Sequence, residues 1–95
     1  MNSKAIAYLR RRAHTLNPVV RIGYKGLTSS VIQEIDHSLK AHELIKIKIQ
    51  NDEKSVRESM LNKICEVLQT TAIHHIGFQI IVYRAASDPK IVLPE

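Results

Sequence analysis

The run LIKIKI at residues 44–49 constrains the fold most, because apolar and charged side chains alternate strictly along it. Successive side chains of a β-strand point to opposite faces of a sheet, so this alternation predicts a strand. We expect Ile45, Ile47 and Ile49 to face the core. Lys46 and Lys48 then belong to the other face of the sheet, which is at least partly in contact with water.

A short strand is predicted at residues 19–22, VVRI, directly after Pro18. β-branched residues favour strands, and a proline ends a preceding helix. The segment 28–41 between the two strands has helical periodicity, with inward-facing residues Val31, Ile32, Ile35 and Leu39. A helix between two strands predicts a βαβ unit with parallel strands and a right-handed crossover.

The rest of the chain predicts two more helices and two more strands. A helix from Lys4 to about His14 has Ser3 as its N-cap, and a helix at residues 53–69 follows Asn51 and Asp52. Strands are expected at residues 73–76 and 79–84, the last being so apolar that it is central or covered on both faces. The expected apolar stripes are Ile6, Leu9, Ala13 and Leu16 in the first helix, and Val56, Met60, Ile64, Val67 and Leu68 in the third.

These elements give an α/β fold in the order α-β-α-β-α-β-β, with three helices on a small four-stranded mixed sheet. The 95 residues fit a single domain. Residues 85–95 form an extended tail in this prediction, with Ile91 and Leu93 packed against the domain.

Two glycines three residues apart, Gly23 and Gly26, join the first strand to the second helix. Glycine lets the backbone approach a ligand closely, and the helix N-terminus at Thr28 presents N–H groups that suit a phosphate. Lys25 adds a charge at the tip of the loop, and Tyr24 adds a ring on which a base could stack. A plain turn that needs glycines for its own geometry is the alternative.

Positive charge is concentrated at the start of the chain, whose net charge is +5. Residues 1–26 contain no acidic residue, and the first acid in the chain is Glu34. The basic residues of this segment are Lys4, Arg10, Arg11, Arg12, Arg21 and Lys25. Such asymmetry indicates a polyanionic partner, nucleic acid or an anionic membrane, whereas a solvated face that only maintains solubility is the alternative. The first helix lacks an aromatic anchor on its apolar side, which favours docking on the sheet over a membrane.

No catalytic or metal-binding pattern is evident. The five histidines include no HExxH motif, and His74 and His75 are adjacent in a predicted strand, so they point to opposite faces. Cys65 is the only cysteine, which excludes an intramolecular disulfide. We therefore expect no enzyme activity, no metal, no cofactor and no small-molecule substrate. No apolar run or N-terminal leader pattern indicates a membrane, and the expected location is cytoplasmic.

The chain resembles the CRM domain, the chloroplast RNA splicing and ribosome maturation domain, in motifs that follow the family's order. These are LRRRAHTLNPVVRIGYKGLT at residues 9–28, HELIKIK at 42–48, IG at 76–77, VYR at 82–84 and KIVLP at 90–94. One departure is visible after the third helix. The family often has Thr-Gly-Ala there, whereas this chain has Thr70-Thr71-Ala72 and lacks the glycine that usually adopts the left-handed helix end.

The resemblance implies an RNA-binding domain whose core is similar to the C-terminal domain of bacterial translation initiation factor three. It also implies a G-x-x-G loop that contacts RNA backbone, as in KH domains. A free-standing domain of this length is similar to the bacterial YhbY proteins, which are linked to precursors of the large ribosomal subunit.

The resulting hypothesis is a non-catalytic protein that binds ribosomal RNA during ribosome assembly. The expected RNA-binding residues are Gly23, Tyr24, Lys25, Gly26, Thr28, Lys4, Arg10, Arg11, Arg12, Arg21, Lys46, Lys48 and Arg84. The last three lie on strands whose face could instead be covered by a helix. Two alternatives remain, a duplex DNA binder and a protein-interaction adaptor with a basic face.

Overall fold

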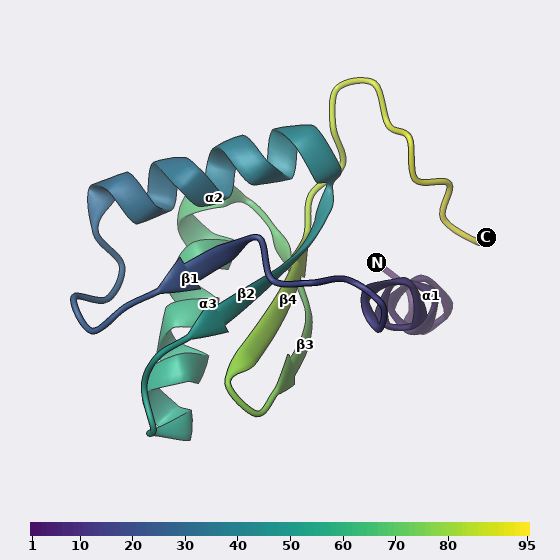
Figure 1. Cartoon of the computed structure of the whole chain (residues 1–95). Helices are drawn as coiled ribbons and strands as arrows, with labels where there is room; N and C mark the ends of the chain where they lie inside the picture. Colours follow the sequence, from purple (N-terminus) through teal and green to yellow (C-terminus); the bar gives the residue numbers. More distant parts are fainter.

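A computed structural model describes all residues, 1–95, and contains the seven predicted elements in the predicted order (Figure 1). The elements are α1 (Ser3–Ala13), β1 (Val20–Ile22), α2 (Ser29–His42), β2 (Leu44–Ile49), α3 (Lys54–Leu68), β3 (Thr71–Ile76) and β4 (Gln79–Tyr83). The α/β fold with three helices and a four-stranded mixed sheet is therefore confirmed.

The sheet has the strand order β1-β2-β4-β3. β1 and β2 are parallel, as the βαβ pattern predicts, and β4 runs antiparallel to both of its neighbours. β4 is covered on both faces, because Ile80 and Val82 belong to one buried cluster and Ile81 and Tyr83 to another. The nearly continuous apolar run of β4 thus reflects its central place.

The two faces of the sheet are covered by different parts of the chain. On one face α2 and α3 pack through Ile35, Leu39 and Ile64. On the other face α1 contributes Leu9 and Ala13, while the C-terminal tail contributes Ile91 and Leu93, so α1 lies apart from the other helices (Figure 1). Since Leu9 and Ala13 of α1 are buried against the sheet and Ile6 packs beside them, the predicted docking of α1 is confirmed. No helix of the structure has the length and apolar character needed to cross a membrane.

The structure corrects two details of α1. The N-cap is Asn2 rather than Ser3, because the Asn2 side chain accepts a hydrogen bond from the Ala5 N–H at 2.8 Å. The helix ends at Ala13, so the predicted stripe residue Leu16 lies beyond it and is 36% exposed. Asn17-Pro18 follows, so the chain leaves the helix before Leu16 can complete the apolar stripe predicted for α1.

The buried face of α3 also differs from the prediction. It consists of Arg57, Leu61 and Ile64, whereas Val67 is 46% exposed. The prediction is confirmed for Ile64, which is buried, and for Met60 and Leu68, which pack against the core, and it is wrong for Val67. The predicted stripe did not include Leu61 or Arg57. The helix ends at Leu68 and is capped by Gln69, which adopts the left-handed conformation (φ 56°, ψ 47°) without a glycine. Its side-chain amide donates a hydrogen bond to the Glu66 carbonyl at 2.9 Å.

Candidate nucleic-acid interface

The G-x-x-G loop is a tight turn that projects two side chains into solvent. The Gly26 N–H donates a hydrogen bond to the Gly23 carbonyl at 3.0 Å, which closes a four-residue β-turn. Tyr24 and Lys25 occupy the two central positions of the turn, and Tyr24 is 87% exposed. The loop therefore presents an aromatic ring and a cation that make little contact with the rest of the fold.

The two glycines of the loop differ in whether the backbone conformation requires a glycine. Gly26 has φ +74°, a conformation that other residues adopt at a cost in energy. Gly23 has no such conformation, and a Cβ at this position would meet no atom within 4 Å. The fold itself therefore requires a glycine at Gly26 only. At Gly23 the missing side chain leaves the backbone open to close approach from outside.

The N-terminus of α2 lies directly behind this loop. The Thr28 side chain caps the helix by accepting a hydrogen bond from the Val31 N–H at 3.2 Å. The first turn of α2 contains no acidic residue, and Ser29 and Ser30 are exposed. The partial positive charge of this helix end is therefore not neutralised by a carboxylate of its own first turn, which favours an anionic ligand at the loop.

Three basic side chains continue from the loop along the sheet. Arg21 of β1 is paired in register with Lys48 of β2, and both are exposed. Lys46 lies two residues earlier on β2 and projects from the same face, with only 8% of the residue exposed. Its ammonium group makes no ion pair or hydrogen bond in the structure. We call Lys25, Arg21, Lys48 and Lys46 the basic track.

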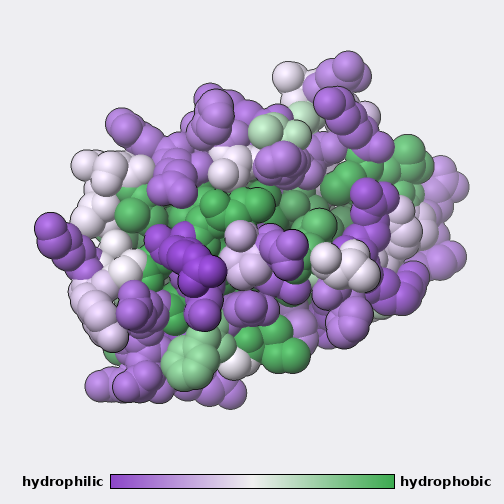
Figure 2. Space-filling view, in the orientation of Figure 1, coloured by the Kyte–Doolittle hydropathy of each residue, from purple (hydrophilic) through white to green (hydrophobic).

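The basic track ends at a groove of about 540 Å³ between the C-terminal end of α1 and β2. Arg12, His42 and Lys46 supply the ionisable side chains of this groove, and no carboxylate lines it. Leu16 and Val19 are among its apolar residues. Figure 2 shows an apolar band bordered by hydrophilic side chains on the side of the molecule where β1 lies in front. The packed stem of Lys46 holds its charge at the groove, where the charged side chains that an anion would meet are those of Arg12 and Lys46.

The basic residues of α1 do not all have the same freedom. Arg10 donates a hydrogen bond from Nε to the Ile73 carbonyl at 2.9 Å, so it fastens α1 to β3. Arg12 donates one to the Tyr8 hydroxyl at 3.1 Å and lies 5.8 Å from the centre of the Tyr8 ring. Lys4 and Arg11 are exposed and make no such bond. These two side chains can reach a ligand without breaking a contact within the fold.

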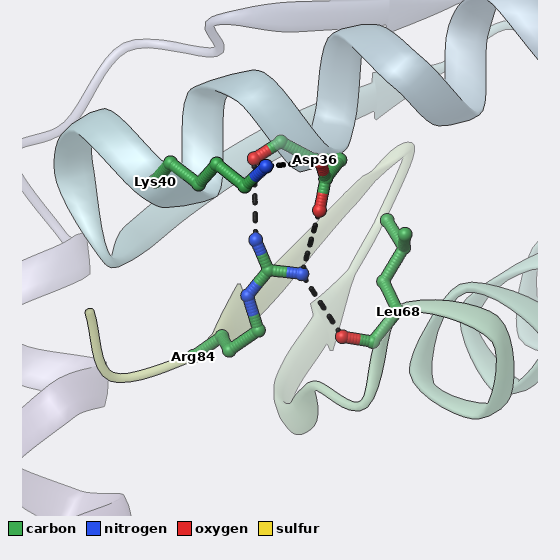
Figure 3. Close-up of polar contacts among 4 residues, drawn as sticks. All are labelled: Asp36, Lys40, Leu68 and Arg84. Carbon is green, nitrogen blue, oxygen red and sulfur yellow. Dashed lines mark hydrogen bonds and ion pairs between the residues drawn. The ribbon is translucent and has the colours of Figure 1, made fainter. Parts of the chain in front are cut away.

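Arg84 lies away from the basic track and has a role within the fold (Figure 3). Its guanidinium lies 2.9 Å from the Asp36 carboxylate and donates hydrogen bonds to the carbonyls of Leu68 at 3.0 Å and Asp36 at 3.2 Å. The hydrogen bond from Arg84, followed by that from Lys40, lowers the pKa of Asp36. Arg84 therefore joins the end of β4 to α2 and α3, and the structure does not bring it together with the G-x-x-G loop.

The sequence pattern did not identify Arg57 and Phe78, two residues that shape the surface beside the loop. Arg57 is only 7% exposed and donates hydrogen bonds to the Asn51 carbonyl at 2.7 Å and to His75 Nε2 at 3.2 Å. Its guanidinium carbon lies 4.9 Å from the centre of the Phe78 ring. The helical spacing of residues 57, 61 and 64 could have indicated that all three lie on one buried face of α3. Because residue 57 is an arginine, the apolar pattern did not include it.

The amino-acid sequence of the chain matches a known protein family. The CRS1 / YhbY (CRM) domain matches residues 1–84. A Haemophilus influenzae protein named "RNA-binding protein" is 35% identical over 94 residues, which cover 99% of this chain and 95% of that protein. A Bacillus subtilis protein named "Probable RNA-binding protein YqeI" is 26% identical over 95 residues, covering 99% of each chain.

The fold comparison agrees with the sequence comparison. The solution structure of the hypothetical protein SAV1595 from Staphylococcus aureus superimposes with a TM-score of 0.87 at 28% sequence identity, and the match covers 99% of both chains. The sequence match extends from α1 to the end of β4 and includes the G-x-x-G loop. The chain therefore belongs to the CRS1/YhbY (CRM) domain family.

Proposed function

We propose that this protein binds RNA without catalysing a reaction, and that the G-x-x-G loop and the basic track hold the RNA backbone. The observation that carries the proposal is the loop itself. The backbone at Gly23 is open to close approach although the fold does not require a glycine there. Lys25 and the N-terminus of α2, whose first turn contains no acidic residue, lie beside it. Relatives that are named RNA-binding proteins support the same conclusion.

The chemistry of the surface fits phosphates better than base edges. Backbone N–H groups of the loop and the Lys25 ammonium can bind one or two phosphates at the N-terminus of α2. Arg21, Lys48 and Lys46 then follow the strand pair toward the groove beside α1, and Lys4 and Arg11 extend the positive surface. Contacts of this kind give affinity that falls steeply with salt and depends little on sequence.

We propose further that the RNA is ribosomal and belongs to a precursor of the large ribosomal subunit, in the cytoplasm. The support is the resemblance of the whole chain to free-standing bacterial CRM domains. The assignment requires no cofactor and no small-molecule substrate, because phosphate recognition by amides and cations is complete in itself.

Fluorescence anisotropy with a structured fragment of large-subunit ribosomal RNA, titrated with salt, tests the proposal. The wild type is compared with Arg11→Glu/Lys25→Glu and with a charge-matched control, Lys54→Glu/Lys63→Glu, on the exposed side of α3. We expect steep salt dependence for the wild type and the control, and loss of binding for the first variant. Absence of wild-type binding at low salt, or equal loss in both variants, would refute the proposed backbone site. Duplex DNA that competes better than RNA would support the DNA alternative.

A further inference from the structure

A second groove, of about 510 Å³, lies beside the G-x-x-G loop. Its lining includes two exposed aromatic residues, Tyr24 and Phe78, together with Lys48 and Gln50. The groove is thus contiguous with the basic track through Lys48. Unlike the groove beside α1, it combines rings with polar side chains, which is the composition of a site for an unpaired base.

Backbone hydrogen bonds fix the two walls of this groove. The Ile49 N–H donates to the Phe78 carbonyl at 2.7 Å, and the next N–H, that of Gln50, donates to the Ile22 carbonyl at 2.8 Å. The β3–β4 turn and the G-x-x-G loop therefore flank the end of β2 on opposite sides. Two strand spacings, roughly 9–10 Å, separate their backbones. Tyr24 and Phe78 both line the groove at this end of the sheet.

Phe78 is held in place by the buried Arg57. The guanidinium lies 4.9 Å from the ring centre and is itself fixed by its hydrogen bonds to the Asn51 carbonyl and to His75. Phe78 nevertheless remains 47% exposed as a residue. An exposed phenylalanine whose position is already set loses little conformational entropy when a base stacks on it.

The charges along the groove orient a nucleotide. Lys48 and its neighbour Arg21 mark the end that continues into the basic track. Asp52 and Glu53, at the start of α3, also line the groove and repel a phosphate there. Their carboxylates can accept hydrogen bonds from the amino group of a base. The phosphate is therefore favoured on the strand side and the base edge on the α3 side.

We propose that this groove binds one unpaired nucleotide of the RNA, with its base stacked on Phe78 and Tyr24 and its phosphate on Lys48 and Arg21. The inference rests on the proposed RNA-binding function and adds a substrate class to it. The preferred RNA then contains an unpaired base next to the backbone segment that the loop holds.

The test compares two RNA duplexes without hairpin loops, identical except that one carries a single-nucleotide bulge, at one salt concentration, by fluorescence anisotropy. Phe78→Ala is expected to lower affinity for the bulged RNA about tenfold and to leave affinity for the fully paired RNA unchanged. Phe78→Tyr, which keeps a ring, is expected to retain the preference. Val67→Ala is the control for loss of an exposed apolar side chain, and thermal unfolding shows that each variant is folded.

The outcomes separate this inference from the function on which it rests. Equal binding of both RNAs by the wild type, or no effect of Phe78→Ala on the bulged RNA, would overturn the nucleotide site and leave the backbone site intact. An equal loss for both RNAs would also overturn it, because a stacking platform for an unpaired base has no role on a fully paired stem. If the wild type binds neither RNA, the proposed function fails first, and the nucleotide site fails with it.

Discussion

The Glu43 carboxylate accepts a hydrogen bond from the Lys90 backbone N–H at 2.8 Å and thereby fastens the C-terminal tail to the junction of α2 and β2. The same carboxylate also accepts hydrogen bonds from the N–H groups of Ile91 at 3.1 Å and Ala86 at 3.0 Å. Glu43 is only 3% exposed, and its own backbone has the unusual φ of 65°. One buried side chain thus determines where the tail covers the sheet.

Replacement of Glu43 by glutamine is expected to destabilise the protein in a pH-dependent way. The Ala86 N–H most strongly lowers the pKa of Glu43, with burial opposing it and the N–H groups of Lys90 and Ile91 adding to it. A lowered folded-state pKa means that the carboxylate stabilises the fold above its unfolded value of about 4.5, and that this is lost as the pH falls through the folded value. We expect Glu43→Gln to lower the free energy of unfolding at neutral pH by about 1–3 kcal/mol.

Urea unfolding at a series of pH values measures this effect, with Glu34→Gln on the exposed side of α2 as the control. The difference between the wild type and Glu43→Gln is expected to shrink toward acid pH, where the wild-type carboxyl is protonated as well. A difference that remains constant across the pH range would contradict the assignment.

Replacement of Arg84 separates stability from RNA binding. Arg84→Met leaves the Leu68 carbonyl and one side of the Asp36 carboxylate without their partner, and we expect a loss of about 1–3 kcal/mol in the free energy of unfolding. Lys40→Met breaks only the exposed ion pair with Asp36 and is expected to cost less than about 1 kcal/mol. RNA affinity is expected to be unchanged in both variants. A selective loss of RNA affinity in folded Arg84→Met would place Arg84 on the RNA surface after all.

The two loop glycines are expected to respond differently to alanine. Gly26→Ala forces a side chain into a positive φ and is expected to lower stability by about 1 kcal/mol. Gly23→Ala meets no neighbouring atom and is expected to leave the melting temperature unchanged while weakening RNA binding, because its methyl group occupies the approach to the backbone. Melting curves and anisotropy on the same samples test the pair. Unchanged affinity of Gly23→Ala would show that RNA does not approach the loop at this residue.

Lys46 offers a test of the groove beside α1. Lys46→Met keeps an apolar stem of similar length in the buried site and removes only the charge, so stability is expected to be preserved. If the Lys46 ammonium contacts a phosphate, the slope of log affinity against log salt falls by about one. Lys63→Met, on the exposed side of α3, is expected to leave the slope unchanged. Equal slopes for the two variants would remove Lys46 from the proposed RNA surface.

The sequence determined the elements, their order and the parallel β1–β2 pair, because these follow from local signals: the LIKIKI alternation, Pro18 and the capping threonine before α2. It also located the G-x-x-G loop at a helix N-terminus, since the motif and the cap are contiguous in the chain. The central place of β4 followed from its apolar run.

Only the tertiary structure decided which charged side chains are used within the fold. Arg84 and Arg57 are basic residues in the sequence like any others, yet one joins β4 to two helices and the other lies buried beneath Phe78. Their partners, such as Asp36 and His75, are distant in the sequence and become neighbours only when the sheet order and the helix rotations are set. The spacing of apolar residues in the sequence predicts whether a segment is a helix or a strand. Whether a charged side chain is buried and paired depends on which distant residues the fold places beside it.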